Sequence, residues 1–188
     1  MSAIIRPYRG IMPKIHPTAF VAETAVIIGD VEIGAGSSVW YGCVISGDVN
    51  QIRIGCNTNI QDGTVIHVNH DRNGEDYRES GGGMPTFIGD DITVGHMALL
   101  HACRLESSCF VGMRAVVMDE AVVQKNAMVA AGALVSPGKI VQTGQLWTGT
   151  PAKYRRDLSQ EELDYFPCSA TSYAELAASY LTGNEAPL

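Results

Sequence analysis

The chain has 188 residues, 46% of them apolar and 18% charged, which is enough to bury one continuous core. Its net charge of −7 provides no basic surface, so we expect neither nucleic acid nor a membrane among its partners. No run approaches the ~18 apolar residues of a membrane span, and no signal peptide is expected in the first residues. The five cysteines are odd in number and form no CxxC pair, which favours a reducing compartment, and we expect the cytoplasm.

An apolar residue, here called an anchor, returns every six positions along most of the chain. This period fits neither an α-helix nor an alternating strand. It fits a solenoid in which each hexapeptide is a short strand plus a turn and three hexapeptides close one triangular coil. A sandwich of short strands would have to produce the period by coincidence, so we predict an all-β solenoid with the anchors pointing inward. The anchors are Ile15, Val21, Ile27, Ile33, Val39, Ile45, Ile54, Ile60, Ile66, Ile88, Val94, Leu100, Leu105, Val111, Val117, Val123, Val129 and Val135.

A small residue stands four positions after most anchors and is expected to fit the corner of the coil. Glycine often follows an anchor directly, as at Gly34, Gly55, Gly89, Gly95 and Gly112, and we expect it to supply a positive φ at the turn. The small residues are Ala19, Ala25, Ser37, Cys43, Thr58, Thr64, Ala98, Cys109, Ala115, Ala121, Ala127 and Ala133.

Residues 1–150 are expected to form the β-helix domain. Within it, residues 68–85 are polar and glycine-rich, and they read as a loop inserted at one corner. Residues 151–188 are expected to form a C-terminal helical extension that caps or covers the coil, because a stacked repeat needs protection at its open end.

The extension carries its own helix signals. Ser159 followed by Glu162 predicts a capping-box start. Pro167 is expected to interrupt the helix, because proline removes a backbone donor. Residues 171–181 are then expected to form a second helical segment that stops near Gly183.

Two histidines hold equivalent positions in the repeat. His67 directly follows the anchor Ile66, and His101 directly follows the anchor Leu100. With the inserted loop removed, Leu100 lies three hexapeptides after Ile66, which is one full coil. Stacked strands lie ~4.8 Å apart, so the two imidazoles can both reach a metal at about 2.0–2.1 Å.

His96 comes two residues after the anchor Val94, one hexapeptide before His101, and therefore belongs to the neighbouring face. Three-sided coils packed around a three-fold axis bring different faces together, so His96 would reach the same metal from another chain. Three histidines with an open fourth position are typical of catalytic zinc. The alternative is ordinary polar decoration of the surface. Cys103, two residues after His101, is a further soft-ligand candidate.

The ordered motifs NIQDGTVIHV at residues 59–68 and IGDDITVGHMALLHAC at residues 88–103 resemble those of γ-class carbonic anhydrases and their bacterial relatives. The resemblance runs from about Ile11 to Tyr180. It implies a left-handed parallel β-helix in a homotrimer, interfacial zinc (iron or cobalt in some settings), and hydration of carbon dioxide to bicarbonate. The family's metal ligands correspond to His67, His96 and His101.

The same resemblance implies roles for polar residues around the metal. Gln61 is expected to hydrogen-bond the metal-bound water, and Asn59 to line the same pocket. Tyr173 is expected to close the site. The members of the polar network at the subunit contact are Asp48, Asp62 and Arg53.

One departure from the family pattern bears on activity. Ser46 stands where the family commonly has the arginine of Arg-Gly-Asp, so we expect activity to be low or conditional. The family's proton-shuttle acids have no direct match, and Glu75, Asp76 and Glu79 are candidates only by location. Two other functions stay open. One is a CoA-dependent acyltransferase or thioesterase on the same fold, and the other is a non-catalytic trimeric scaffold, for which Ser46 is the main hint.

Overall fold

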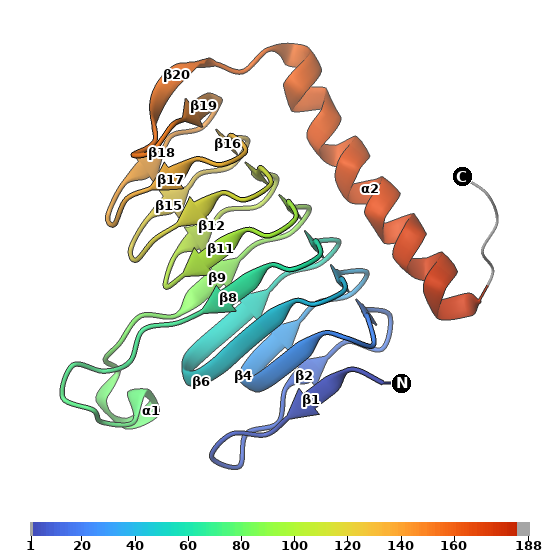
Figure 1. Cartoon of the computed structure of the whole chain (residues 1–188), viewed down its shortest axis with the longest axis vertical. Helices are drawn as coiled ribbons and strands as arrows, with labels where there is room; N and C mark the ends of the chain where they lie inside the picture. The colour runs from blue at the N-terminus through green and yellow to red at the C-terminus, as the bar shows by residue number, and fades with distance from the viewer. Residues whose placement is uncertain (1, 184–188) are drawn as a thin grey trace.

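The computed structural model describes residues 2–183 of the chain, which form a parallel β-helix with one long helix beside it (Figure 1). Within these residues the strands form a twelve-stranded and an eight-stranded sheet, and the only strand pair that runs antiparallel is β19 (Gln145–Thr148) with β20 (Lys153–Asp157). Two long strands, β4 (Val26–Ile33) and β6 (Val44–Ile54), turn a corner of the coil and thereby join two faces into the larger sheet. The predicted solenoid is confirmed.

The coil has three faces, which we number. Face 1 contains the first halves of β4 (Val26–Ile33) and β6 (Val44–Ile54), together with β1 (Ile4–Arg6), β8 (Val65–His67), β11 (Leu99–His101), β14 (Val116–Val117) and β17 (Leu134–Val135). Face 2 contains the second halves of β4 and β6, together with β2 (Lys14–Ile15), β9 (Thr86–Ile88), β12 (Arg104–Leu105), β15 (Val122–Val123) and β18 (Ile140–Val141). Face 3 contains β3 (Phe20–Val21), β5 (Ser38–Val39), β7 (Asn59–Ile60), β10 (Thr93–Val94), β13 (Phe110–Val111), β16 (Met128–Val129), β19 (Gln145–Thr148) and β20 (Lys153–Asp157).

The anchors form the core. Every anchor from Ile27 to Val135 is buried, and Ile15 and Val21, in the first coil, are partly buried. The small residues from Ala25 to Ala133 lie beside them, also buried. Each fully buried Val, Leu or Ile stabilises the fold by about 1.5–3 kcal/mol relative to exposure, so the hexapeptide pattern itself supplies the driving force for the coil.

The glycines that follow anchors serve a different purpose from the predicted one. None of the five has a positive φ. A Cβ on Gly34 would lie 2.6 Å from backbone atoms of Gly55, and one on Gly112 would lie 2.4 Å from the nitrogen of Ala131. Glycine is therefore required because successive coils approach closely at this position, and the positive φ falls on other turn residues, such as Gly36 and Asn57.

The inserted segment, residues 68–85, leaves the coil between β8 and β9 and contains one short helix, α1 (Tyr77–Ser80) (Figure 1). Its two ends meet in an antiparallel bridge between Asn69 and Met84. The buried side chain of Asn50 donates to the carbonyl of Asn69 at 3.3 Å and so fixes the base of the loop to β6.

The C-terminal segment forms one helix, α2 (Gln160–Thr182), so the predicted interruption was wrong. Ser159 and Glu162 form the capping box as predicted, and Gly183 ends the helix in the left-handed conformation. Pro167 lies inside the helix and removes only its own backbone donor. Burial of one helix face against the coil outweighs that loss. The buried residues are Phe166, Ser169, Ala170 and Ala177.

The helix runs along face 3 (Figure 1). An aromatic cluster joins the two, because the ring of Trp40 lies 5.7 Å from that of Tyr173 and 5.4 Å from that of Tyr180. This packing fixes the position of Tyr173 over the coil. Residues 184–188 of the predicted extension lie outside the described residues. Neither described helix has the length and apolar character that crossing a bilayer requires.

Candidate metal centre

His67 and His101 lie side by side on face 1. Their backbones are register partners between β8 and β11, as the repeat count predicts. The Nδ1 atom of His67 lies 3.3 Å from the Nε2 atom of His101. Two nitrogen ligands at about 2.0–2.1 Å from a tetrahedral zinc would also lie about 3.3–3.4 Å apart.

A carboxylate contacts the other nitrogen of each ring. The Nε2 atom of His67 lies 3.1 Å from Asp48 Oδ1, and the Nδ1 atom of His101 lies 2.6 Å from Asp119 Oδ1. An ionised carboxylate only accepts hydrogen bonds, so the contacted nitrogen carries the proton in both neutral rings. In that neutral tautomer the two facing nitrogens both lack a proton, an arrangement that a shared cation stabilises. The donor set fits a metal.

His96 lies on a different side of the coil, after β10 of face 3. Its Nδ1 atom lies 2.9 Å from Asp62 Oδ2, which leaves its Nε2 atom as the unprotonated nitrogen. Its side chain is 40% exposed. Within residues 2–183 of a single chain, no group of three His, Cys, Asp or Glu side chains is placed to hold a metal ion.

Gln61, His96 and Tyr173 line one cavity between face 3 and α2. Gln61 is 5% exposed, and its amide nitrogen donates to Asn59 Oδ1 at 3.0 Å. Asn59 lies behind the cavity and donates in turn to Thr93 Oγ1 at 2.9 Å. Gln61 and Tyr173 therefore line the cavity together with His96, whereas the buried Asn59, contrary to the prediction, does not line it. The amide bonds leave the carbonyl oxygen of Gln61 available as an acceptor.

The cavity walls are otherwise largely apolar. Phe110, Met113, Met128 and Tyr165 also line the cavity, beside His96. Burial, followed by the charge of Asp62, raises the pKa of Tyr173. Its phenol is therefore a neutral donor at physiological pH, and the site offers a small apolar compartment with a few fixed polar groups, as ligand cavities commonly do.

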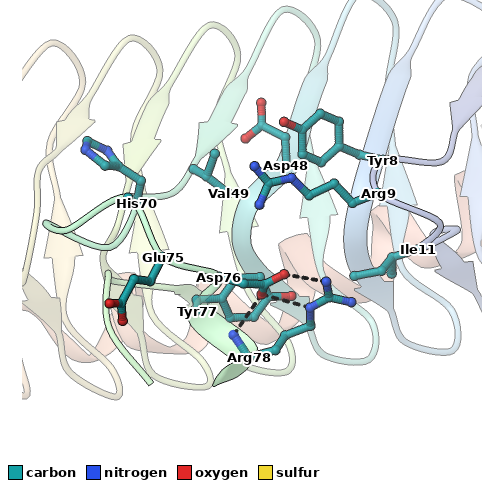
Figure 2. Close-up of a pocket in the computed structure, with 11 residues that line it drawn as sticks. Tyr8, Arg9, Ile11, Asp48, Val49, His70, Glu75, Asp76, Tyr77 and Arg78 are labelled. Carbon is teal, nitrogen blue, oxygen red and sulfur yellow. Dashed lines mark hydrogen bonds and ion pairs between the residues drawn. The ribbon is translucent and has the colours of Figure 1, made fainter. Parts of the chain in front are cut away.

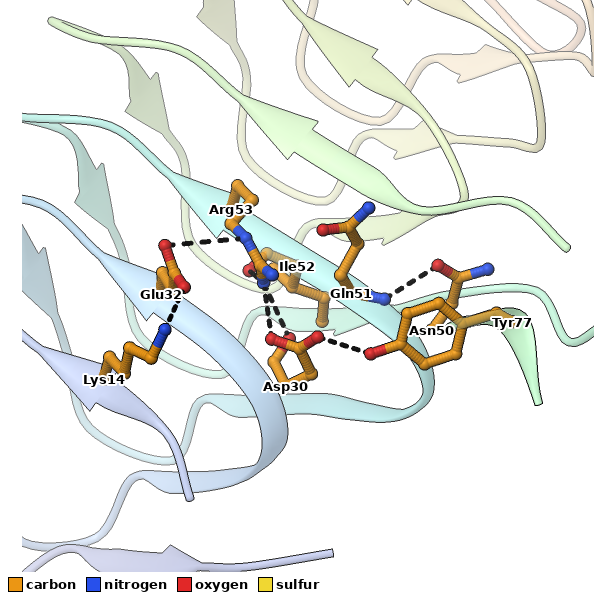
Figure 3. Close-up of polar contacts among 8 residues, drawn as sticks. All are labelled: Lys14, Asp30, Glu32, Asn50, Gln51, Ile52, Arg53 and Tyr77. Atoms are coloured by element: carbon orange, nitrogen blue, oxygen red, sulfur yellow. Dashed lines mark hydrogen bonds and ion pairs between the residues drawn. The ribbon is translucent and has the colours of Figure 1, made fainter. Parts of the chain in front are cut away.

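Arg53 lies apart from Asp48 and Asp62, the other two predicted members of the polar network. Its guanidinium pairs with Asp30 at 2.8 Å and approaches Glu32 at 3.6 Å (Figure 3). The hydroxyl of Tyr77 donates to the same Asp30. Burial raises the pKa of Asp30, but hydrogen bonds from Arg53 and Tyr77 outweigh burial and hold it below its usual value. This cluster ties α1 of the inserted loop to β4.

Asp48 also lines a cavity between residues 8–11, where Tyr8 and Ile11 form an isolated antiparallel bridge, and the inserted loop (Figure 2). Of the three candidate proton-shuttle acids in the loop, Glu75 and Asp76 line this cavity and Glu79 does not. Asp76 is held by Arg78, whose Nε atom donates at 2.9 Å, and this pairing keeps the pKa of Asp76 well below its usual range. Glu75 lines the same cavity, but its carboxylate points away from Asp48 (Figure 2).

Cys103 is not placed to be a ligand. Its side chain is buried in the core, and burial raises the pKa of the thiol to about 12. At neutral pH it is a protonated thiol, whereas metals bind the thiolate. No disulfide forms among the five cysteines in the part of the chain that the structure describes.

Asp119 was missed in the sequence. It follows the anchor Val117 by two residues, the same spacing that separates Asp62 from Ile60. That shared spacing is the signal that would have found it, because Asp62 and Asp119 each contact a histidine.

No protein-family model matches the chain. It is 46% identical over 176 residues to "Gamma carbonic anhydrase 1, mitochondrial" of Arabidopsis thaliana, covering 94% of this chain and 62% of that protein. It spans between 60% and 64% of the length of the three plant relatives that it matches. A "Probable carbonic anhydrase" of Methanocaldococcus jannaschii is 47% identical, and the match covers 84% of this chain and 91% of that protein.

Among solved structures, a hexapeptide transferase family protein from Anaplasma phagocytophilum superposes with a TM-score of 0.85 and 44% identity, over 94% of this chain and 98% of the other. The archaeal match covers nearly the whole relative, and the plant relatives carry the class in their names. These matches confirm the resemblance, and the chain belongs to the γ-class carbonic anhydrase family.

Proposed function

We propose that this chain is a homotrimeric, metal-dependent enzyme that hydrates carbon dioxide to bicarbonate. His67 and His101 of one chain and His96 of a neighbour would hold the metal. The observation that carries the proposal is the 3.3 Å approach of His67 Nδ1 to His101 Nε2, each belonging to a ring whose other nitrogen contacts a carboxylate. His96, with the same kind of carboxylate contact but on another face, is the ligand that a neighbour would bring.

Zinc is the metal that we propose first, with iron or cobalt as the other candidates, because neutral imidazoles suit all three. Such a metal, when bound, lowers the pKa of water to about 7 and so supplies a nucleophile at neutral pH. The carboxylates fix each ring in the tautomer that presents an unprotonated nitrogen. This is the contribution of Asp48, Asp62 and Asp119.

The cavity beside His96 would hold and orient the reactants. Its apolar walls suit carbon dioxide, which has no charge and no hydrogen-bond donor. The carbonyl oxygen of Gln61 can accept a hydrogen bond from the attacking water, and Asn59 holds that amide in place. Tyr173, on α2, can donate to an oxygen of the substrate or product. The proton released would leave by way of the cavity that Glu75 and Asp48 line.

Stopped-flow hydration assays test the proposal on protein loaded with zinc, with iron and with cobalt. Hydration above the rate of the buffer, lost in His101→Ala at equal trimer content, would support it. Protein that binds one metal per site and still shows no hydration with any of the three metals would refute the catalytic part.

The acyltransferase or thioesterase alternative has one specific observation in its favour. The solved structure at 44% identity is named a hexapeptide transferase family protein. The cavity beside His96 also shares Met128 and Tyr165 with a second cavity along α2, so an extended ligand has room there. Turnover of acetyl-CoA by metal-free protein would favour this alternative over hydration.

A further inference from the structure

The side chain of Asp119 bonds two residues at once. Its Oδ1 atom lies 2.6 Å from Nδ1 of His101, and its Oδ2 atom accepts from Nδ2 of Asn69 at 2.9 Å. Asn69 and Asp119 are separated by 50 residues in sequence. One partner on each oxygen holds the plane of the Asp119 carboxylate in place. This fixes the direction from which the carboxylate contacts the imidazole of His101.

Asn69 stands at the base of the inserted loop. Its backbone nitrogen and oxygen both bond Met84, at 2.9 and 3.0 Å. Its carbonyl also accepts from the buried amide of Asn50. The backbone that carries the Asn69 amide is therefore held by three hydrogen bonds, and the closed base of the loop sets where that amide points.

The other two histidine partners lack this support. Within residues 2–183, the side-chain oxygens of Asp48 and Asp62 accept from no side chain other than their own histidine, His67 and His96. His101 is thus the proposed ligand whose carboxylate partner is anchored by a second element. Asp119 is 27% exposed, so without Asn69 it would be free to turn toward water.

We propose that the base of the inserted loop positions His101 through the chain Asn69–Asp119–His101, so that Asn69 and Asp119 are positioning residues of the metal centre. This inference rests on the proposed metal-binding function. Hydrogen bonds to metal-ligating histidines typically change metal affinity by about 10–100-fold when they are removed. Asn69 acts one step further away, so its removal should cost less.

The experiment measures Co²⁺ and Zn²⁺ affinity of the full-length trimer for wild type, Asp119→Asn, Asn69→Leu and the double variant. We expect a loss of about 10–100-fold for Asp119→Asn and about three- to tenfold for Asn69→Leu. The double variant should be no weaker than Asp119→Asn alone, because Asn69 acts only through Asp119. Gln160→Leu is the matched control, since it removes an amide-to-carboxylate bond of 2.7 Å to Asp164 on α2.

A second readout needs no metal. Nitrogen-15 spectra of the metal-free protein should show His101 protonated at Nδ1 in wild type and a mixture of tautomers in Asn69→Leu. Wild-type affinity together with an unchanged tautomer in Asn69→Leu would overturn the inference, as would losses that multiply in the double variant. Wild-type protein that binds neither ion refutes the proposed function, and the tautomer measurement then decides the positioning chain separately.

Discussion

Mixed trimers test the division of the metal centre between chains. His96→Ala removes the ligand that a chain contributes to the metal site of its neighbour. His67→Ala removes one of the two ligands that a chain contributes to its own metal site. His67 and His101 are register partners on face 1, whereas His96 lies after face 3, so the two substitutions damage different halves of each site. Either variant alone should therefore lose stoichiometric metal.

The expected recovery follows from counting. When the two variants associate at random in equal amounts, about three quarters of the trimers contain both kinds of chain. A closed ring of three such chains has one contact at which an intact His67–His101 pair meets an intact His96. About one third of the sites in those trimers are complete, so the mixture should regain about one quarter of the wild-type metal.

The assay is metal content per chain after unfolding, refolding together and gel filtration, with the mixture verified by mass. The control mixes His67→Ala with His101→Ala, which damage the same half and should regain nothing. Equal recovery in both mixtures, or none in verified mixed trimers, would show that the ligands do not divide between chains as we argue.

Three further predictions concern single substitutions. Ser46→Arg should raise kcat/KM up to about tenfold, because it restores the arginine that the family commonly has at this position. Ser46 lies two residues before Asp48 on the outer side of β6, so the new cation would lie near that carboxylate. Stopped-flow assays at matched metal content check this. Leu100→Ala, at a fully buried position, should lower the free energy of unfolding by about 2–5 kcal/mol in urea titrations at fixed chain concentration. Tyr77→Phe should cost about 1 kcal/mol at pH 7 by the same measurement. Because the folded pKa of Asp30 is depressed, this contribution is present above its unfolded pKa of about 4 and fades as the pH falls through the folded value, so equal losses at pH 7 and pH 3 would contradict it.

The sequence alone determined the coil and the pairing of two histidines. A six-residue apolar period leaves one arrangement in which all anchors point inward, and counting anchors then places His67 beside His101. Handedness came from the family resemblance, because the period is the same for either hand. The capping box at Ser159 was also readable, since its hydrogen bonds are local.

Only the tertiary structure decided the rest, because those outcomes depend on contacts between distant segments. The helix continues through Pro167 because its inner face packs on the coil. Glycine is required after the anchors because the next coil approaches closely there, and not because the turn needs a positive φ. The link from Asn69 to Asp119 joins a loop base to a corner 50 residues later. A repeat pattern fixes which face a residue occupies, whereas the direction of a side chain and its partner depend on how the loop closes above that face.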